Sequence, residues 1–221
     1  MQPARIAALL EPFLRTVNDQ QPTTNGRRLT AADLSRISTY IDILTRWNAR
    51  VNLTSIRDPE EIVTRHFGES FFLGRLLVLT EARLTLADLG SGAGFPGLPI
   101  KLWAPRIALT LIESNHKRAA FLREVTRALA LSDVRVANTR AETLPPASFD
   151  VVTLRAVERI SDSLQVASRL LTPRGRLALL VGSSQLEAIH AALPSVDWQA
   201  PMAVPQSKSR VVLIGSQNHP R

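Results

Sequence analysis

Cysteine is absent from the 221-residue sequence, and histidine occurs only four times. The lack of cysteine excludes disulfide bonds, thiolate nucleophiles and cysteine-ligated zinc, and it suits a reducing compartment. His66, His116, His190 and His219 are scattered along the chain without the spacing of metal ligands. The sequence therefore predicts a protein without a metal site.

Long hydrophobic runs are also missing from the chain. No stretch reaches the roughly 18 consecutive apolar residues that indicate a membrane-spanning helix. The N-terminal segment 1–19 lacks the uninterrupted apolar run of a secretory signal, because Glu11, Pro12 and Arg15 interrupt it. We therefore expect a cytoplasmic protein without a membrane partner.

Lysine is scarce although the chain is basic. The net charge is +8 and the pI is about 11.2, yet only Lys101, Lys117 and Lys208 are lysines among the 27 basic residues. A basic balance favours a polyanionic partner such as nucleic acid. The excess of arginine suits bidentate contacts with phosphate, but it is equally explained by GC-rich codon usage.

The chain divides into an N-terminal helical extension (1–82) and an α/β domain (83–221). In the extension, Thr30 can cap a helix that carries one apolar stripe at three- and four-residue steps. The stripe consists of Leu34, Ile37, Ile41, Leu44 and Trp47. A second helix is expected from Pro59 to Leu79, because Asp58 before Pro59 is typical of a helix start.

Strands and helices alternate in the second domain. The expected strands are 85–89, 108–112, 134–137, 150–154, 176–181, 198–204 and 210–214. The expected helices are 98–103, 116–129, 162–171 and 185–193. This order predicts a mostly parallel seven-stranded sheet with helices on both faces, in which the last two strands form an antiparallel hairpin.

A glycine-rich turn, Asp88–Gly97, lies between the first expected strand and the following helix. Glycines at the carboxyl end of a parallel strand allow a ligand to approach the backbone closely. The spacing Gly92-x-Gly94-x-x-Gly97 fits a dinucleotide. Asp88 instead suits a cationic methionine moiety, or it only anchors the loop. The candidate cofactor contacts here are Asp88, Gly90, Gly92, Gly94 and Phe95.

Later strands end in further candidate cofactor contacts. Glu113 follows the second strand, where a carboxylate can accept hydrogen bonds from both ribose hydroxyls of an adenosine. Ala141 and Glu142 follow the third strand, where the turn can border the adenine, although a plain turn is as consistent with the pattern. Arg155 ends the fourth strand on the expected ligand side.

Two motifs give the chain a specific family resemblance. The loop Gly90–Pro99 closely resembles that of the bacterial RsmG (GidB) family, and Trp47–Pro59, with Arg65-His66-Phe67, looks like the family's N-terminal signature. The segments Lys117–Arg123 and Phe149–Ala156 are also similar. Family members usually carry Asp where this chain has Glu69, and Lys-Gly where it has Val181-Gly182. The resemblance covers about residues 30 to 180.

The resemblance implies a Rossmann-like class I methyltransferase fold and S-adenosylmethionine as the cofactor. It also implies methylation of N7 of guanine 527 in 16S ribosomal RNA, in the small ribosomal subunit, by a protein that we expect to be a monomer. The expected positioning residues are Arg155, Lys117 and Arg123. The RNA-binding candidates are Asn52, Arg65, His66, Lys117, Arg118 and Arg123, and each of the charged ones suits a solvated surface equally well. His66 is also consistent with a role in helix packing.

Three other functions remain compatible with the residues alone. A nicotinamide-dependent oxidoreductase shares the glycine pattern and the acidic residue after the second strand. A methyltransferase that acts on another RNA, a protein or a small molecule would have the same cofactor site. An RNA-binding module without activity would not need the glycine turn and Glu113.

Overall fold

The computed structural model describes residues 1–15, 28–77, 83–155 and 160–217. The N-terminal extension is helical, as predicted, and includes α1 (Pro3–Leu14), for which the sequence predicted no bounds, and α2 (Ala31–Asn48). Thr30 caps α2 in a capping box with Asp33: the Thr30 hydroxyl accepts the Asp33 N–H, and the Asp33 carboxylate accepts the Thr30 N–H. This reciprocal pair satisfies donors that have no partner at a helix start.

The helix predicted from Pro59 contains an irregular middle turn. It consists of α3 (Pro59–Glu61), the π-helix η1 (Ile62–Gly68) and α4 (Glu69–Leu76). Asp58 caps its start by accepting the Glu61 N–H at 2.8 Å, as expected. The predicted end at Leu79 lies outside the described residues. A π-helical turn is wider than an α-helical turn, and such turns often occur at functional sites.

The strands of the second domain are close to those predicted. The structure has β1 (Thr85–Leu89), β2 (Ala108–Ile112), β3 (Val134–Ala137), β4 (Phe149–Arg155), β5 (Leu171–Gly182), β6 (Val196–Trp198), β7 (Met202–Ala203) and β8 (Arg210–Gln217). The connecting elements are α5 (Gly97–Trp103), α6 (His116–Ala128), η2 (Ala141–Thr143), α7 (Ile160–Leu170), η3 (Ser183–Gln185) and α8 (Leu186–Ala192). Strands β1, β2 and β3 match the predicted bounds residue for residue.

The sheet order is β3-β2-β1-β4-β5-β8-β6, with β7 also paired to β8. Strands β1 to β5 run parallel, and β8 runs antiparallel to β5. The carboxyl ends of β1, β2 and β4 therefore meet at one edge, and ligands of open α/β sheets bind at such edges.

One strand prediction needs a correction. Segment 198–204 was expected to be a single strand, but β6 and β7 replace it, and both pair with β8, so the sheet has eight strands rather than seven. The pairing shifts by one residue between Trp198↔Gly215 and Met202↔Val212. Pro201 lies in this shift, and proline lacks the N–H that a continuous ladder requires.

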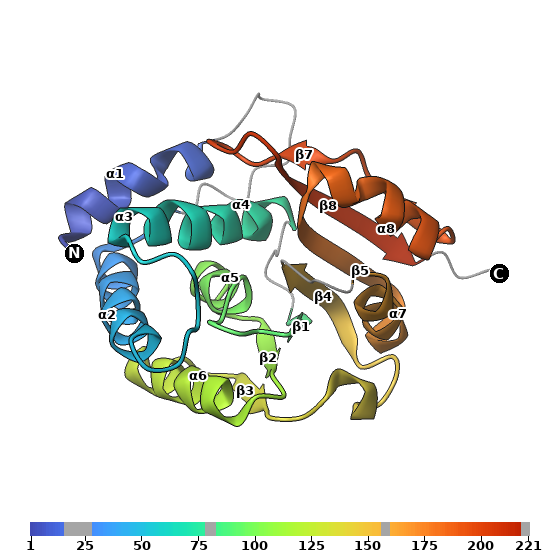
Figure 1. Ribbon diagram of the computed structural model, residues 1–221, viewed down its shortest axis with the longest axis horizontal. Helices are drawn as coiled ribbons and strands as arrows, with labels where there is room; N and C mark the ends of the chain where they lie inside the picture. The colour runs from blue at the N-terminus through green and yellow to red at the C-terminus, as the bar shows by residue number, and fades with distance from the viewer. Residues whose placement is uncertain (16–27, 78–82, 156–159, 218–221) are drawn as a thin grey trace.

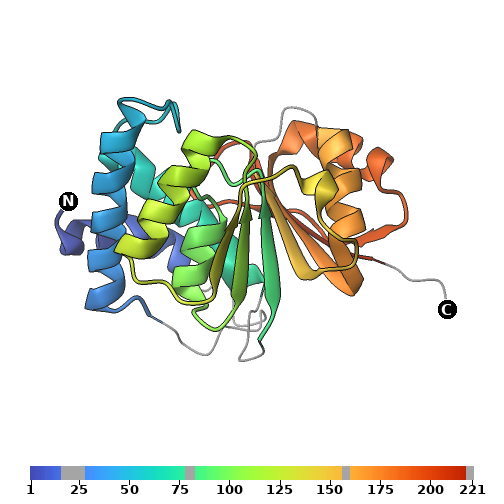
Figure 2. The same ribbon diagram turned by 90° about the horizontal axis from the view of Figure 1, so that it is seen from below.

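Helices cover both faces of the sheet (Figures 1 and 2). On one face, α7 and α8 enclose a cluster of buried side chains that includes Leu164 and Ile189. On the other face, α5, α6 and the N-terminal helices share one continuous core, which includes Ile37, Phe71 and Phe121. No helix in the described parts of the chain is long and apolar enough to cross a membrane.

Candidate active site

The glycine turn after β1 uses left-handed backbone at three positions. The φ angles are +68° at Gly90, +53° at Gly92 and +85° at Gly94, a region that side chains other than glycine rarely occupy. A Cβ at Gly90 would meet nothing within 4 Å, whereas a Cβ at Gly94 would collide with the Tyr40 hydroxyl and Leu98. Gly94 is therefore required for packing, and Gly90 leaves open backbone beside the crevice.

Asp88 lies underneath this turn rather than in the crevice. It is 1% exposed, and its carboxylate accepts hydrogen bonds from the Thr153 hydroxyl at 2.8 Å and from the Gly97 N–H at 3.2 Å. Burial raises the pKa of Asp88 to about 6, although these hydrogen bonds oppose the shift. The geometry thus favours the second interpretation of Asp88, an anchor of the loop, over direct contact with a cofactor.

Glu113 closes the other side of the turn. Its carboxylate accepts the Gly92 N–H at 3.0 Å and the Asn115 N–H at 2.8 Å, and the residue is 5% exposed. Asn138 donates to the Glu113 carbonyl oxygen at 2.8 Å and fixes the strand end. A carboxylate has about four acceptor positions, so two remain for ligand hydroxyls.

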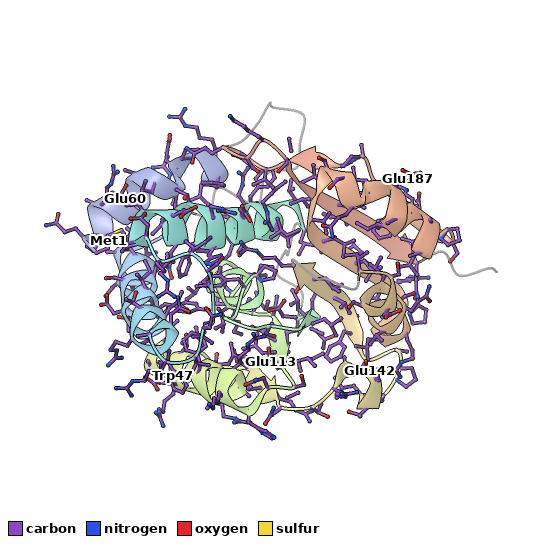
Figure 3. All side chains as sticks on the ribbon, in the orientation of Figure 1. Met1, Trp47, Glu60, Glu113, Glu142 and Glu187 are labelled. Atoms are coloured by element: carbon purple, nitrogen blue, oxygen red, sulfur yellow. The ribbon has the colours of Figure 1, made fainter. Side chains whose placement is uncertain are left out.

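A cavity of about 400 Å³ lies at the carboxyl ends of β1 and β2. This volume is in the usual range for small-molecule sites. Four of the predicted cofactor contacts line it, namely Gly90, Glu113, Ala141 and Glu142. The labelled Glu113 and Glu142 belong to the part of the molecule between α6 and α7 (Figure 3). Gly92, Gly94, Phe95, Asp88 and Arg155 are not among its lining residues.

The Phe95 side chain belongs to an aromatic stack. Its ring lies between Tyr40 and His66, with centroid distances of 5.3 and 4.6 Å and nearly parallel planes. The Tyr40 hydroxyl donates to the Ala93 carbonyl oxygen at 2.5 Å. The stack therefore fastens α2 and η1 onto the glycine turn, and only the backbone of Phe95 is left for a cofactor.

His66 is 8% exposed and pairs through Nε2 with the Thr54 hydroxyl at 2.8 Å. Burial lowers the pKa of His66 to about 2, and Arg155, Arg65 and Arg210 act in the same direction. The ring is therefore neutral at physiological pH. This position favours the packing role over contact with RNA.

Arg155 ends β4 and takes part in a buried charged group that we call the Glu69 cluster (Glu69, Arg155 and Arg210). Arg155 Nη2 and Arg210 Nε each lie 3.1 Å from Glu69 Oε2. Arg155 also donates to the Arg65 carbonyl oxygen of η1 at 2.7 Å. Burial lowers the pKa of Arg155 to about 10, while Glu69 raises it, so Arg155 is charged at neutral pH.

Three buried atoms of this cluster lack a hydrogen bond of good geometry. Within the described ranges they are Glu69 Oε2, Arg155 Nη1 and Arg210 Nε, of which Glu69 Oε2 and Arg210 Nε still face each other as an ion pair at 3.1 Å. Buried polar atoms are nearly always satisfied in folded proteins. Arg155 Nη1 is therefore the donor of this cluster that a ligand at this edge of the sheet could use.

The other basic candidates lie on exposed surfaces. Lys117, Arg118 and Arg123 are exposed on α6, whose start Asn115 caps by accepting the Lys117 and Arg118 N–H groups. Asn52 is exposed in the loop after α2. Figure 2 shows this loop and the start of α6 at the same end of the molecule as the glycine turn.

Sequence reasoning missed several residues that shape the site. Asn48 holds the loop around Asn52, because its side-chain oxygen accepts the Leu53 N–H at 2.7 Å and the Thr54 N–H at 3.0 Å. Asp162, Ser163 and Val166 of α7 line the cavity of about 400 Å³ at the ends of β1 and β2. Asn48 belongs to the N-terminal motif Trp47–Pro59, whereas nothing in the local pattern of α7 reveals which of its faces meets the crevice.

Comparison with solved structures identifies the fold. A SAM-dependent methyltransferase from Aquifex aeolicus matches with a TM-score of 0.60 and 16% identity, covering 76% of this chain and 97% of that one. The α/β domain therefore has the predicted Rossmann-like methyltransferase fold.

Sequence relatives carry a more specific name. A protein from Xanthomonas campestris pv. campestris, "Ribosomal RNA small subunit methyltransferase G", is 43% identical over 171 residues, covering 75% of this chain and 78% of the relative. A relative of the same name from Stenotrophomonas maltophilia is 39% identical over 208 residues, covering 92% and 91%. The model of the GidB family, described as rRNA small subunit methyltransferase G, matches residues 33–212. The chain therefore belongs to the rRNA small subunit methyltransferase G (GidB) family.

Proposed function

We propose that this protein transfers a methyl group from S-adenosylmethionine to N7 of guanine 527 in the 16S RNA of the small ribosomal subunit. It would do so in the cytoplasm and as a monomer. The observation that carries the proposal is the crevice at the carboxyl ends of β1 and β2, where the bare backbone of Gly90 faces Glu113. Family membership and the net charge of +8 support an RNA substrate.

The crevice residues suit an adenosyl ligand. Glu113 would accept hydrogen bonds from the ribose hydroxyls, and Gly90 would let the methionine part pass close to the backbone. Ile112, Ala141 and Val166 offer apolar surface for the adenine ring. When bound, S-adenosylmethionine supplies an electrophilic methyl group on a positively charged sulfur.

Methylation of guanine N7 requires no general base. N7 of neutral guanine has a free lone pair and loses no proton before it attacks a methyl group. The two buried titratable side chains near the turn are consistent with this, because Asp88 is hydrogen-bonded to Thr153 and Gly97, and His66 is hydrogen-bonded to Thr54. Catalysis would then come from alignment of the reacting atoms and from exclusion of water.

The two parts of the chain would bind different ligands. Residues 83–221 would bind the cofactor, and the extension 1–82 would contribute to RNA binding. The exposed Arg65 and Asn52 of the extension, with Lys117, Arg118 and Arg123 of α6, are the contacts that we propose for RNA. His66 and Arg155 would not contact RNA but would hold η1 in place, through the stack with Phe95 and the hydrogen bond to the Arg65 carbonyl oxygen.

Mapping of N7-methylguanine in 16S RNA tests the proposal. Cells that lack the gene are expected to lose the mark at guanine 527, and re-expression of the wild-type chain is expected to restore it. Re-expression of Glu113→Gln, which removes the carboxylate charge, should restore it poorly. Calorimetric titrations with S-adenosylmethionine and NAD complete the test, and binding of NAD alone would favour the oxidoreductase. An unchanged mark in the deletion strain would refute the RNA target.

A further inference from the structure

A second cavity of about 370 Å³ lies apart from the cofactor crevice. One wall comes from the end of α1 and from η1, and the other comes from the loop between β7 and β8. The residues that line it are Phe13, Thr64, Arg65, Glu69, Pro205, Gln206, Ser207, Lys208, Ser209 and Arg210. Since α1 and η1 belong to the extension, this cavity joins the two parts of the chain.

Positive charge dominates this cavity. Arg65, Lys208 and Arg210 line it, while Glu69, the one carboxylate among its described lining residues, has a side chain that is 3% exposed and already paired with Arg155 and Arg210. Arg65 forms an ion pair with Glu61 at 2.8 Å, but its side chain remains 49% exposed. The hydroxyl of Ser207 accepts the Arg210 N–H at 3.1 Å, which leaves its own hydrogen free to donate. These donors together suit a single anionic group with several oxygens.

Arg210 connects this cavity to the edge of the sheet. It begins β8 and pairs with Gly182, the last residue of β5. Its Nε lies 3.1 Å from Glu69 Oε2, and its side chain is 21% exposed. Through Glu69 it is linked to Arg155 at the end of β4. An anion in this cavity would therefore lie beside the strand ends that border the reacting atoms.

We propose that this cavity binds one backbone phosphate of the RNA substrate, next to the nucleotide that is methylated. The inference rests on the proposed RNA methyltransferase function and adds a subsite to it. Arg65 and Lys208 contact the phosphate from opposite walls, and Arg210 supports it from the buried side. Because the two walls belong to different parts of the chain, RNA bound here also holds the extension against the α/β domain.

The salt dependence of RNA binding tests the subsite. The double variant Arg65→Gln/Lys208→Gln removes both exposed cations, whereas Arg135→Gln/Arg174→Gln removes two exposed cations elsewhere. The affinity for an oligonucleotide with the target sequence is measured by fluorescence anisotropy over a range of salt. We expect the cavity variant to bind about tenfold more weakly, with a log–log salt slope smaller by about 0.7 to 0.9, as for one lost phosphate contact. The control variant should keep the wild-type slope.

Two outcomes would overturn the subsite while leaving the proposed function intact. The first is a wild-type chain that methylates RNA and a cavity variant whose slope and affinity are unchanged. The second is competition by inorganic phosphate, at constant ionic strength, that disappears in the cavity variant although the RNA slope stays the same. That result would assign the cavity to a free anion. A wild-type chain that neither binds nor methylates the RNA would instead refute the proposed function. Calorimetry with S-adenosylmethionine should give equal affinities for all three proteins.

Discussion

The cofactor crevice and the Glu69 cluster lie at the same edge of the sheet but are built in different ways. The crevice is made mainly of the turns that follow β1, β2 and β3, including Gly90, Glu113 and Ala141, with one face of α7 beside them. The cluster is made of three charged side chains from α4, β4 and β8 that meet only in the folded chain. The crevice has the form of a ligand site, whereas the cluster holds separate segments together.

This difference predicts different consequences of substitution. A change of Glu113 in the crevice should weaken ligand binding and disturb the protein only locally, because the backbone N–H groups that its carboxylate accepts belong to the adjacent turns at Gly92 and Asn115. A change in the cluster should destabilise the protein, because it leaves a buried charge without its partner. The following experiments test that contrast.

Glu69→Ala is expected to have the largest effect. Its removal leaves Arg155 and Arg210 buried without a counter-charge, which costs about 3–5 kcal/mol in the free energy of unfolding. Urea denaturation measures this loss. Glu69→Gln keeps the volume and should lose less. A Glu69→Ala protein as stable as the wild type would mean that water already screens the two arginines.

Glu113→Gln should weaken the binding of S-adenosylmethionine without unfolding the protein. Hydrogen bonds to a charged group contribute about 1.5–3 kcal/mol, so the dissociation constant should rise by about 10- to 150-fold. Isothermal titration calorimetry measures the change, and circular dichroism checks the fold. The control is Glu142→Gln, whose exposed side chain accepts no hydrogen bond from a neighbour in the described chain and should affect affinity less. Equal losses of S-adenosylmethionine affinity in both variants would contradict the proposed ribose-binding role of Glu113.

His66→Gln should change how stability depends on pH. The pKa of His66 is about 2 in the folded protein and near 6.5 in the unfolded chain, so between these values the unfolded chain binds more protons. The free energy of unfolding of the wild type therefore falls as the pH falls below 6.5. Between pH 7.5 and 5.5, urea denaturation should show the wild type losing about 1.4 kcal/mol more than the variant. Parallel pH profiles would show that His66 is accessible to protons in the folded state.

The sequence predicted the crevice better than the cluster, for a physical reason. Strands β1 to β3 and the glycine turn have strong local signals, and parallel pairing brings their carboxyl ends together. Gly90, Glu113, Ala141 and Glu142 could therefore be placed on one cavity before the fold was known. Asp88 and Phe95 were found by the same motif, but only packing shows that their side chains point into the protein.

Long-range contacts and breaks in regular structure were harder to predict. Glu69, Arg155 and Arg210 are separated by many residues, and no periodicity relates them. The single strand expected over 198–204 is wrong because the pairing shifts near Pro201, and hydrophobic alternation does not reveal such a shift. The π-helical turn in 62–68 was equally hidden, since its residues suit an ordinary helix.

That π-helical turn makes the length of the chain before Glu69 critical. A π-helical turn is equivalent to one residue inserted into an α-helix. Deletion of a single residue between Ile62 and Gly68 would still leave a continuous helix. It would, however, rotate everything on one side of the deletion by about 100° relative to the other. Glu69 and the Arg65 carbonyl could then no longer both face Arg155. Homologues should therefore tolerate substitutions in this segment far more readily than insertions or deletions.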